Sequence, residues 1–191
     1  MRDLIITQNI TLDGVIDNSS SWFDPADQQG DADDLNQALM AQAHASDAFL
    51  VGRTTFEEMR AYWPQQHEDA TGVTDHLNRV AKYVVSTTLA DPEWDGTTIF
   101  RGPLADDVRA LKASTGHDIV IAGSIRLCHA LIEAGLVDEY RLFTYPLVEG
   151  RGRRLFQNRT SVPPLQPVEI RKFRNGVVLS RYRVDARPAR T

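Results

Sequence analysis

The chain has 191 residues and a mass of 21.4 kDa, a usual size for one folded domain. Hydrophobic residues make up 42% and charged residues 25% of the chain, which excludes a disordered protein, a collagen-like repeat and a bare coiled coil. The single cysteine, Cys128, excludes an internal disulfide framework and a cysteine-rich zinc or iron–sulfur site. We expect one domain over residues 1–186, followed by a short tail over 187–191.

The net charge of −5 is unevenly distributed along the chain. Residues 3–52 contain nine Asp and no Glu, Lys or Arg, whereas residues 151–191 contain eleven Lys or Arg and two acids. The acidic balance argues against nucleic acid as a partner, and the basic stretch is either a phosphate contact or a solvated face. No stretch approaches the ~20 apolar residues of a membrane span, and the N-terminus lacks a signal-peptide pattern. We therefore expect a cytoplasmic protein with no membrane partner.

Hydrophobic periodicity predicts strands that alternate with helices up to about residue 135, and almost only strands after it. The expected strands are Leu4–Ile10, Ala48–Gly52, Tyr83–Ser86, Thr97–Phe100, Ile119–Ala122, Glu139–Leu147, Val168–Asn175 and Val177–Asp185. The expected helices are Asp31–Ala45, Thr54–Tyr62, Val73–Ala81, Asp106–Ala113 and Ser124–Ala134. Asn175-Gly176 is a strong hairpin signal. This order predicts a three-layer α/β/α fold with a mixed, mostly parallel central sheet and an antiparallel C-terminal hairpin.

Three predicted strand ends carry glycine, hydroxyl or arginine side chains where we expect the chain to turn into a helix. They are Leu50–Thr55, Val84–Thr88 and Ile121–Arg126. Glycine, exposed helix N–H groups, hydroxyls and arginine together suit phosphate, and ligands of such sheets bind at the carboxyl ends of the strands. Any one of these segments could be a plain helix cap, but three in one chain favour an extended ligand that carries phosphates. The chain has neither G-x-G-x-x-G after its first strand nor a P-loop motif, which argues against an ordinary Rossmann site or a P-loop.

Six motifs in a fixed order carry a resemblance to a known superfamily. They are Thr11–Gly14, Gly52–Thr55, Val85–Thr87, Ala122–Ser124, Gly135–Glu139 and Pro146–Phe156. Their order resembles the dihydrofolate-reductase-like superfamily, and most of all the branch with the reductase domain of riboflavin biosynthesis and its stand-alone relatives. The match runs from about residue 3 to 184. It implies a mixed sheet flanked by helices and an NADPH-dependent reduction of a small molecule.

The resemblance also implies roles for individual residues around NADPH. Gly52, Arg53, Thr54 and Thr55 would meet the phosphates of the cofactor; Ser86 and Thr87 would lie near its 2′-phosphate; and Gly123, Ser124, Ile125 and Arg126 would cradle the pyrophosphate. Asn9, Thr11 and Asp13 would border the nicotinamide and substrate cleft. Apart from the resemblance, we expect the aromatic Trp22 to flank the cleft entrance and stack on a flat heterocycle, with core packing as its alternative. Arg53 has an alternative as a surface arginine paired with Glu57. The superfamily typically has a cis peptide at a Gly-Gly pair, which here reads Ala122-Gly123, and its isomer is left open.

Reduction needs a proton as well as the hydride that the cofactor brings. Asp13 is one candidate donor, with a turn-forming Asp before Gly14 as its alternative. Asp27 is the other, because Trp22–Asp27 resembles the Trp-x-x-Pro-Ala-Asp stretch of dihydrofolate reductases; its alternative is a solvated loop acid.

The resemblance leads to three functional hypotheses. The first is a reductase most like 5-amino-6-(5-phosphoribosylamino)uracil reductase of riboflavin biosynthesis. The others are a true dihydrofolate reductase and a non-catalytic dinucleotide-binding protein. The histidines show no metal-ligand spacing, so we expect no metal. Relatives of this branch often pair through a sheet edge, which implies a homodimer.

Overall fold

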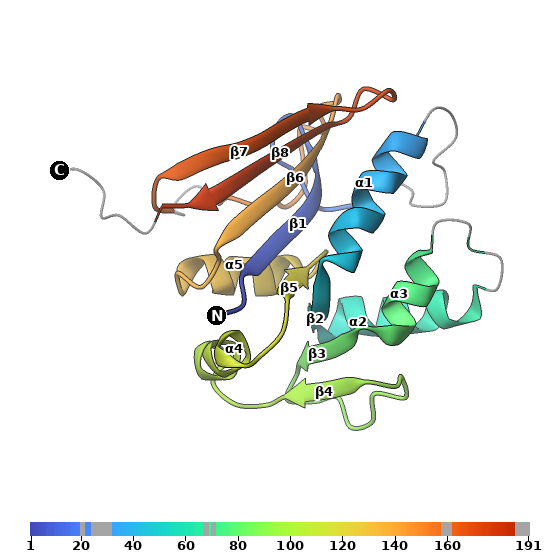
Figure 1. The fold of residues 1–191 in the computed structure, drawn as a ribbon, viewed down its shortest axis with the longest axis vertical. Coiled ribbons are helices and arrows are strands. Elements are labelled where there is room, and N and C mark those ends of the chain that lie inside the picture. The colour runs from blue at the N-terminus through green and yellow to red at the C-terminus, as the bar shows by residue number, and fades with distance from the viewer. Residues whose placement is uncertain (20–21, 24–31, 67–68, 70–71, 158–161, 186–191) are drawn as a thin grey trace.

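The computed structural model describes residues 1–191 apart from 20–21, 24–31, 67–68, 70–71, 158–161 and 186–191. These residues form an eight-stranded sheet with the order β4-β3-β2-β5-β1-β6-β8-β7 (Figure 1). The strands are β1 (Leu4–Thr11), β2 (Ser46–Gly52), β3 (Ala81–Val85), β4 (Thr97–Phe100), β5 (Asp118–Ile121), β6 (Glu139–Tyr145), β7 (Leu165–Lys172) and β8 (Val178–Val184). The helices are α1 (Asp33–His44), α2 (Arg53–Tyr62), α3 (Val73–Arg79), α4 (Leu104–Ala113) and α5 (Ile125–Glu133), with a short 3-10 helix η1 (Trp63–Gln65).

The sheet is parallel from β4 to β6 and antiparallel at its C-terminal end. β6 pairs antiparallel with β8, and β8 pairs antiparallel with β7. The β7–β8 turn needs Gly176, whose φ of 89° lies in the left-handed region that glycine adopts at little cost. The predicted mixed sheet with an antiparallel C-terminal hairpin is therefore confirmed.

Helices cover both faces of the sheet, because successive side chains of a strand point to opposite sides. In β2, Leu50 packs into the cluster that contains Leu131 of α5, while Val51 packs into the cluster that contains Phe56 of α2. α4 and α5 cover the first face, and α1, α2 and α3 cover the second (Figure 1). This confirms the predicted three-layer arrangement.

One expected junction is wrong. β3 leads into a turn and then into β4, and no helix follows it directly. The cause is Ser86, whose hydroxyl oxygen accepts the backbone N–H groups of Thr88 and Leu89 and so closes a turn. The first and third junctions do lead into helices, α2 and α5.

Two further observations complete the description of the fold. The Ala122–Gly123 peptide, whose isomer the sequence left open, is trans. Within the described ranges, no helix is both long and apolar enough to cross a membrane.

Candidate functional site

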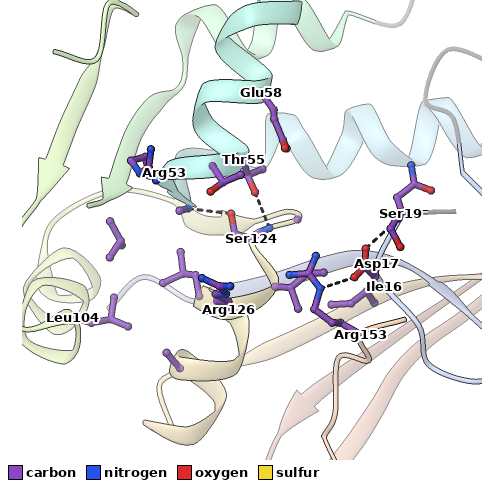
Figure 2. Close-up of a pocket in the computed structure, with 18 residues that line it drawn as sticks. Ile16, Asp17, Ser19, Arg53, Thr55, Glu58, Leu104, Ser124, Arg126 and Arg153 are labelled. Atoms are coloured by element: carbon purple, nitrogen blue, oxygen red, sulfur yellow. Dashed lines mark hydrogen bonds and ion pairs between the residues drawn. The ribbon is translucent and has the colours of Figure 1, made fainter. Parts of the chain in front are cut away.

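A cavity of about 910 Å³ lies at the carboxyl ends of β2 and β5 (Figure 2). These two strands are hydrogen-bonded neighbours in the sheet, so their ends meet although they are far apart in the sequence. The first turns of α2 and α5 line the cavity, together with residues 16–19 and Arg153. The volume is in the upper part of the range for small-molecule and cofactor sites.

Two hydrogen bonds tie the ends of β2 and β5 together. The backbone N–H of Gly52 donates to Ser124 Oγ at 3.0 Å, and the backbone N–H of Ser124 donates to Thr55 Oγ1 at 3.2 Å. Gly123 has a φ of 63°, and a Cβ there would lie 3.1 Å from Thr55 Cγ2, so this close approach requires glycine. Ser124 also has a left-handed backbone conformation, with a φ of 50°. Such a conformation is costly for a non-glycine residue and is often found at functional sites.

The N-termini of α2 and α5 both open into this cavity without a side-chain cap. Gly52 is the N-cap of α2 and Ser124 that of α5, and neither N-cap residue caps its own helix with a side-chain hydrogen bond. First-turn N–H groups have no partner within their own helix, and the helix dipole adds partial positive charge there. Arg53 and Arg126 stand in these two first turns and line the cavity. The arrangement suits two adjacent anionic groups.

An ion pair forms the opposite wall. Arg153 Nε donates to Asp17 Oδ2, and this hydrogen bond lowers the pKa of the Asp17 carboxyl below its usual value. The backbone supports the pair, since the Ile16 N–H donates to the Arg153 carbonyl at 3.0 Å. Trp22 also contacts this segment, because its indole N–H donates to the Asp17 carbonyl at 2.8 Å.

The carboxylate of Asp13 accepts hydrogen bonds from four donors. It accepts the Thr11 hydroxyl at 2.6 Å, the N–H groups of Glu149 and Gly150 at 3.2 and 3.0 Å, and an Arg154 N–H at 3.2 Å. The Thr11 bond is the main cause that lowers the pKa of Asp13 to about 2. A carboxyl with this pKa stays ionised at neutral pH and is poorly suited to donate a proton.

Comparison with known proteins assigns the chain to a family. Residues 2–179 match the family model described as the RibD C-terminal domain. The chain belongs to this family. A curated Bacillus subtilis (strain 168) relative, "Uncharacterized protein YyaP", is 32% identical over 183 residues, which cover 93% of this chain and 92% of the relative.

Solved structures agree on the fold of this RibD C-terminal domain protein. A protein assigned to riboflavin biosynthesis in Shewanella sp. PV-4 superposes with a TM-score of 0.75 at 19% identity, over 96% of this chain and 99% of that one. A Thermotoga maritima diaminohydroxyphosphoribosylaminopyrimidine deaminase/5-amino-6-(5-phosphoribosylamino)uracil reductase gives 0.63 at 16% identity, over 96% of this chain and 57% of that one. At these identities the likeness shows the fold.

The structure brings together the predicted cofactor residues of the first and third segments. The residues from these segments that line the cavity are Gly52, Arg53, Thr54, Thr55, Gly123, Ser124, Ile125 and Arg126. Val85 also lines it, but among the described residues Ser86 and Thr87 are not part of the lining. Arg53 is at the same time bonded to Glu57, as its alternative interpretation expected.

The described residues among those predicted for catalysis and substrate binding lie outside the cavity lining. Asn9, Thr11, Asp13 and Trp22 do not appear among the described lining residues. Thr11 bonds Asp13, and the Trp22 ring contacts the Tyr145 ring at 5.5 Å between centroids. Asp27 falls outside the described residues. The roles predicted for these residues stay predictions.

Sequence reasoning missed three charged residues of the cavity, Asp17, Glu58 and Arg153. Glu58 carried a usable signal, because it lies three residues after Thr55 and so shares its helix face. Asp17 and Arg153 are 136 residues apart, and no local pattern in the sequence links them.

Proposed function

We propose that this RibD C-terminal domain protein is an NADPH-dependent reductase. The closest named reaction is that of 5-amino-6-(5-phosphoribosylamino)uracil reductase. When bound, the nicotinamide cofactor would supply the hydride for a C=N or C=O carbon of a small heterocyclic or sugar-linked substrate. Family membership supports the reaction type, and the geometry of the cavity supports the cofactor.

The two uncapped helix N-termini are the observation that carries this proposal. A dinucleotide has two linked phosphates, and α2 and α5 begin side by side, tied through Gly52, Thr55 and Ser124. The first-turn N–H groups of each helix would donate hydrogen bonds to one phosphate, and Arg126 would add charge. Gly123 lets the end of β5 lie against Thr55 of α2, since a Cβ there would lie 3.1 Å from Thr55 Cγ2.

The two ends of the cavity differ in a way that fits the two ends of the cofactor. Val85 and Leu104 offer apolar surface beside the β3 end, which suits adenine. Asp17, Ser19 and Arg153 offer polar groups at the other end, which suits the nicotinamide carboxamide and the substrate. Arg53 would pair with the 2′-phosphate and so favour NADPH over NADH. Ser86 and Thr87 would lie near the same phosphate.

A fluorescence titration of NADPH tests the proposal. Wild-type protein should bind NADPH with a Kd of about a micromolar or less, and Arg126→Ala should weaken binding roughly tenfold through loss of a charged hydrogen bond. Arg109→Ala is the matched control, because Arg109 is an exposed helical arginine outside the cavity lining. No binding by the wild-type protein, or equal loss in both variants, would contradict the proposed site.

A further inference from the structure

Among the described residues, Asp17 and Glu58 are the two whose carboxyl groups line the cavity, and the carboxyl of Asp13 is bonded next to the Arg153 wall. Asp17 is bonded to Arg153, and the Asp13 carboxylate accepts hydrogen bonds from four donors, so both groups already have partners. Glu58 lines the cavity, and within the described part of the chain its carboxyl has neither an ion pair nor a hydrogen bond. A ligand in this cavity would therefore meet Glu58 as an available carboxylate.

The position of Glu58 on α2 directs its carboxyl to the end of the cavity where we propose that the nicotinamide and the substrate bind. It follows Thr55 by three residues, so both stand on the helix face above the cavity, and Figure 2 shows the Glu58 carboxyl pointing from α2 toward the space above Asp17 and Arg153. Its neighbour Glu57 turns instead toward Arg53, with which it is paired at 3.1 Å. Glu58 is exposed.

We propose that Glu58 is a catalytic carboxylate that accepts a hydrogen bond from the protonated nitrogen of a substrate C=N group. The inference rests on the proposed function and goes further, because it assigns the site to C=N rather than C=O substrates. A carboxylate beside an imine nitrogen stabilises the cationic iminium form, which accepts hydride more readily. Beside a carbonyl, the same charge would repel the negative charge that develops on oxygen during reduction.

The reaction balances without a proton from the protein. The imine nitrogen takes one proton from water, and Glu58 holds the resulting N–H. Hydride then forms a new C–H bond at the C=N carbon, and the π electrons become the nitrogen lone pair. The bound nicotinamide cofactor would supply this hydride, and the amine product keeps the proton on its nitrogen.

The test compares wild type, Glu58→Gln, Glu58→Asp and a control, Glu133→Gln, at the far end of α5. The turnover probes are 2-methyl-1-pyrroline, a cyclic imine, and cyclopentanone, a carbonyl of similar ring size. A second readout needs no turnover: NMR titration of the NADP⁺-bound protein with 2-methylpyrrolidine, a cyclic ammonium ion at neutral pH. NADPH affinity is measured for every variant.

We expect Glu58→Gln to lower kcat/KM for the imine roughly 10²-fold, to weaken the ammonium probe, and to leave NADPH affinity unchanged. Glu58→Asp should recover part of the loss, and Glu133→Gln should match wild type. Unchanged imine turnover in Glu58→Gln, or an equal fall with the carbonyl, would overturn the inference. So would a wild-type protein that binds NADPH but reduces no C=N probe. Failure of the wild type to bind NADPH would instead overturn the proposed function, and this inference with it.

Discussion

Asp13 shows how one side chain can fix the shape of a site from outside it. Its carboxylate joins the turn after β1 to the segment that starts at Glu149, 136 residues further along the chain. That segment carries Arg153, which forms the cavity wall with Asp17. Asp13 therefore acts on the site by holding Arg153 and Asp17 in place, and its low pKa keeps the carboxylate ionised for this purpose.

The first prediction is a pH dependence of stability that Asp13 causes. Its pKa is lowered from 3.8 to about 2, so the stabilisation is complete above the ordinary value and is lost as the pH falls through the lowered one. Urea unfolding should show Asp13→Asn less stable than wild type at pH 7, with the difference shrinking between about pH 4 and pH 2. A constant difference across this range would contradict the assignment.

Arg53 gives a second prediction at the same scale. Its ion pair with Glu57 is weak, because the two side chains are 47% and 37% exposed, so Arg53 can exchange Glu57 for a phosphate. Arg53→Ala should weaken NADPH roughly tenfold and change NADH affinity little, as measured by parallel fluorescence titrations. Equal weakening of both nucleotides would refute the 2′-phosphate role.

The elements that form the site are two strand-to-helix junctions locked against each other. Gly123 must approach Thr55 closely, and Ser124 bonds to both Gly52 and Thr55. The junctions depend on each other, so a bulky change in one should displace the other. This coupling should appear in both stability and cofactor binding.

Gly123→Ala tests the coupling, with Gly135→Ala as a control of the same φ, 63°. A Cβ at Gly135 meets nothing within 4 Å, whereas one at Gly123 meets Thr55 at 3.1 Å. Both variants should lose about 1 kcal/mol of unfolding free energy through left-handed strain, and Gly123→Ala about 1 kcal/mol more through the collision. Only Gly123→Ala should also weaken NADPH, and the same effect in both would argue against locked junctions.

The elements also show what the sequence could predict. Alternating and continuous apolar runs located the strands, and Asn175-Gly176 located the hairpin, because both signals are local. The two phosphate-type junctions were found by residue type, but their contact depends on β2 lying beside β5, which no local pattern states. Ser86 misled the prediction of a helix after β3, because a hydroxyl that closes a turn looks the same in sequence as one that caps a helix.

At the scale of the whole molecule, the amino end of β6 holds a charge cluster distant from the cavity. Glu139 is 1% exposed and accepts hydrogen bonds from Arg141, Arg181 and Arg183. Burial alone would raise its pKa, but the hydrogen bonds from Arg181 and Arg141 outweigh burial and lower it. Glu139 of β6 is therefore ionised, and its hydrogen bonds with Arg181 and Arg183 join β6 to β8.

Glu139→Gln should destabilise the fold without altering the site. The substitution removes the charged acceptor that the three arginines share, although each keeps an ion pair with Asp118, Glu169 or Asp3, and should cost about 2 kcal/mol in urea unfolding. NADPH affinity should stay at the wild-type value, since the cavity lies at the opposite end of the strands. A stable variant would show that the cluster contributes little, and a large loss of affinity would show that the site depends on it.

The oligomeric state is a property of the whole molecule, and we expect a homodimer. β7 is the edge strand of the sheet, and Val168 and Ile170 on it are 49% and 62% exposed. Light scattering of the purified protein should give twice the 21.4 kDa chain mass, and Ile170→Glu should shift it toward the monomer. A wild-type monomer would contradict the expectation.

A crystal structure of the NADP⁺ complex tests the account most directly. We expect the pyrophosphate oxygens within about 3 Å of the first-turn N–H groups of α2 and α5, with the nicotinamide between Glu58 and the Asp17–Arg153 pair. A dinucleotide bound on another surface, or one that contacts only one of the two helix N-termini, would contradict it.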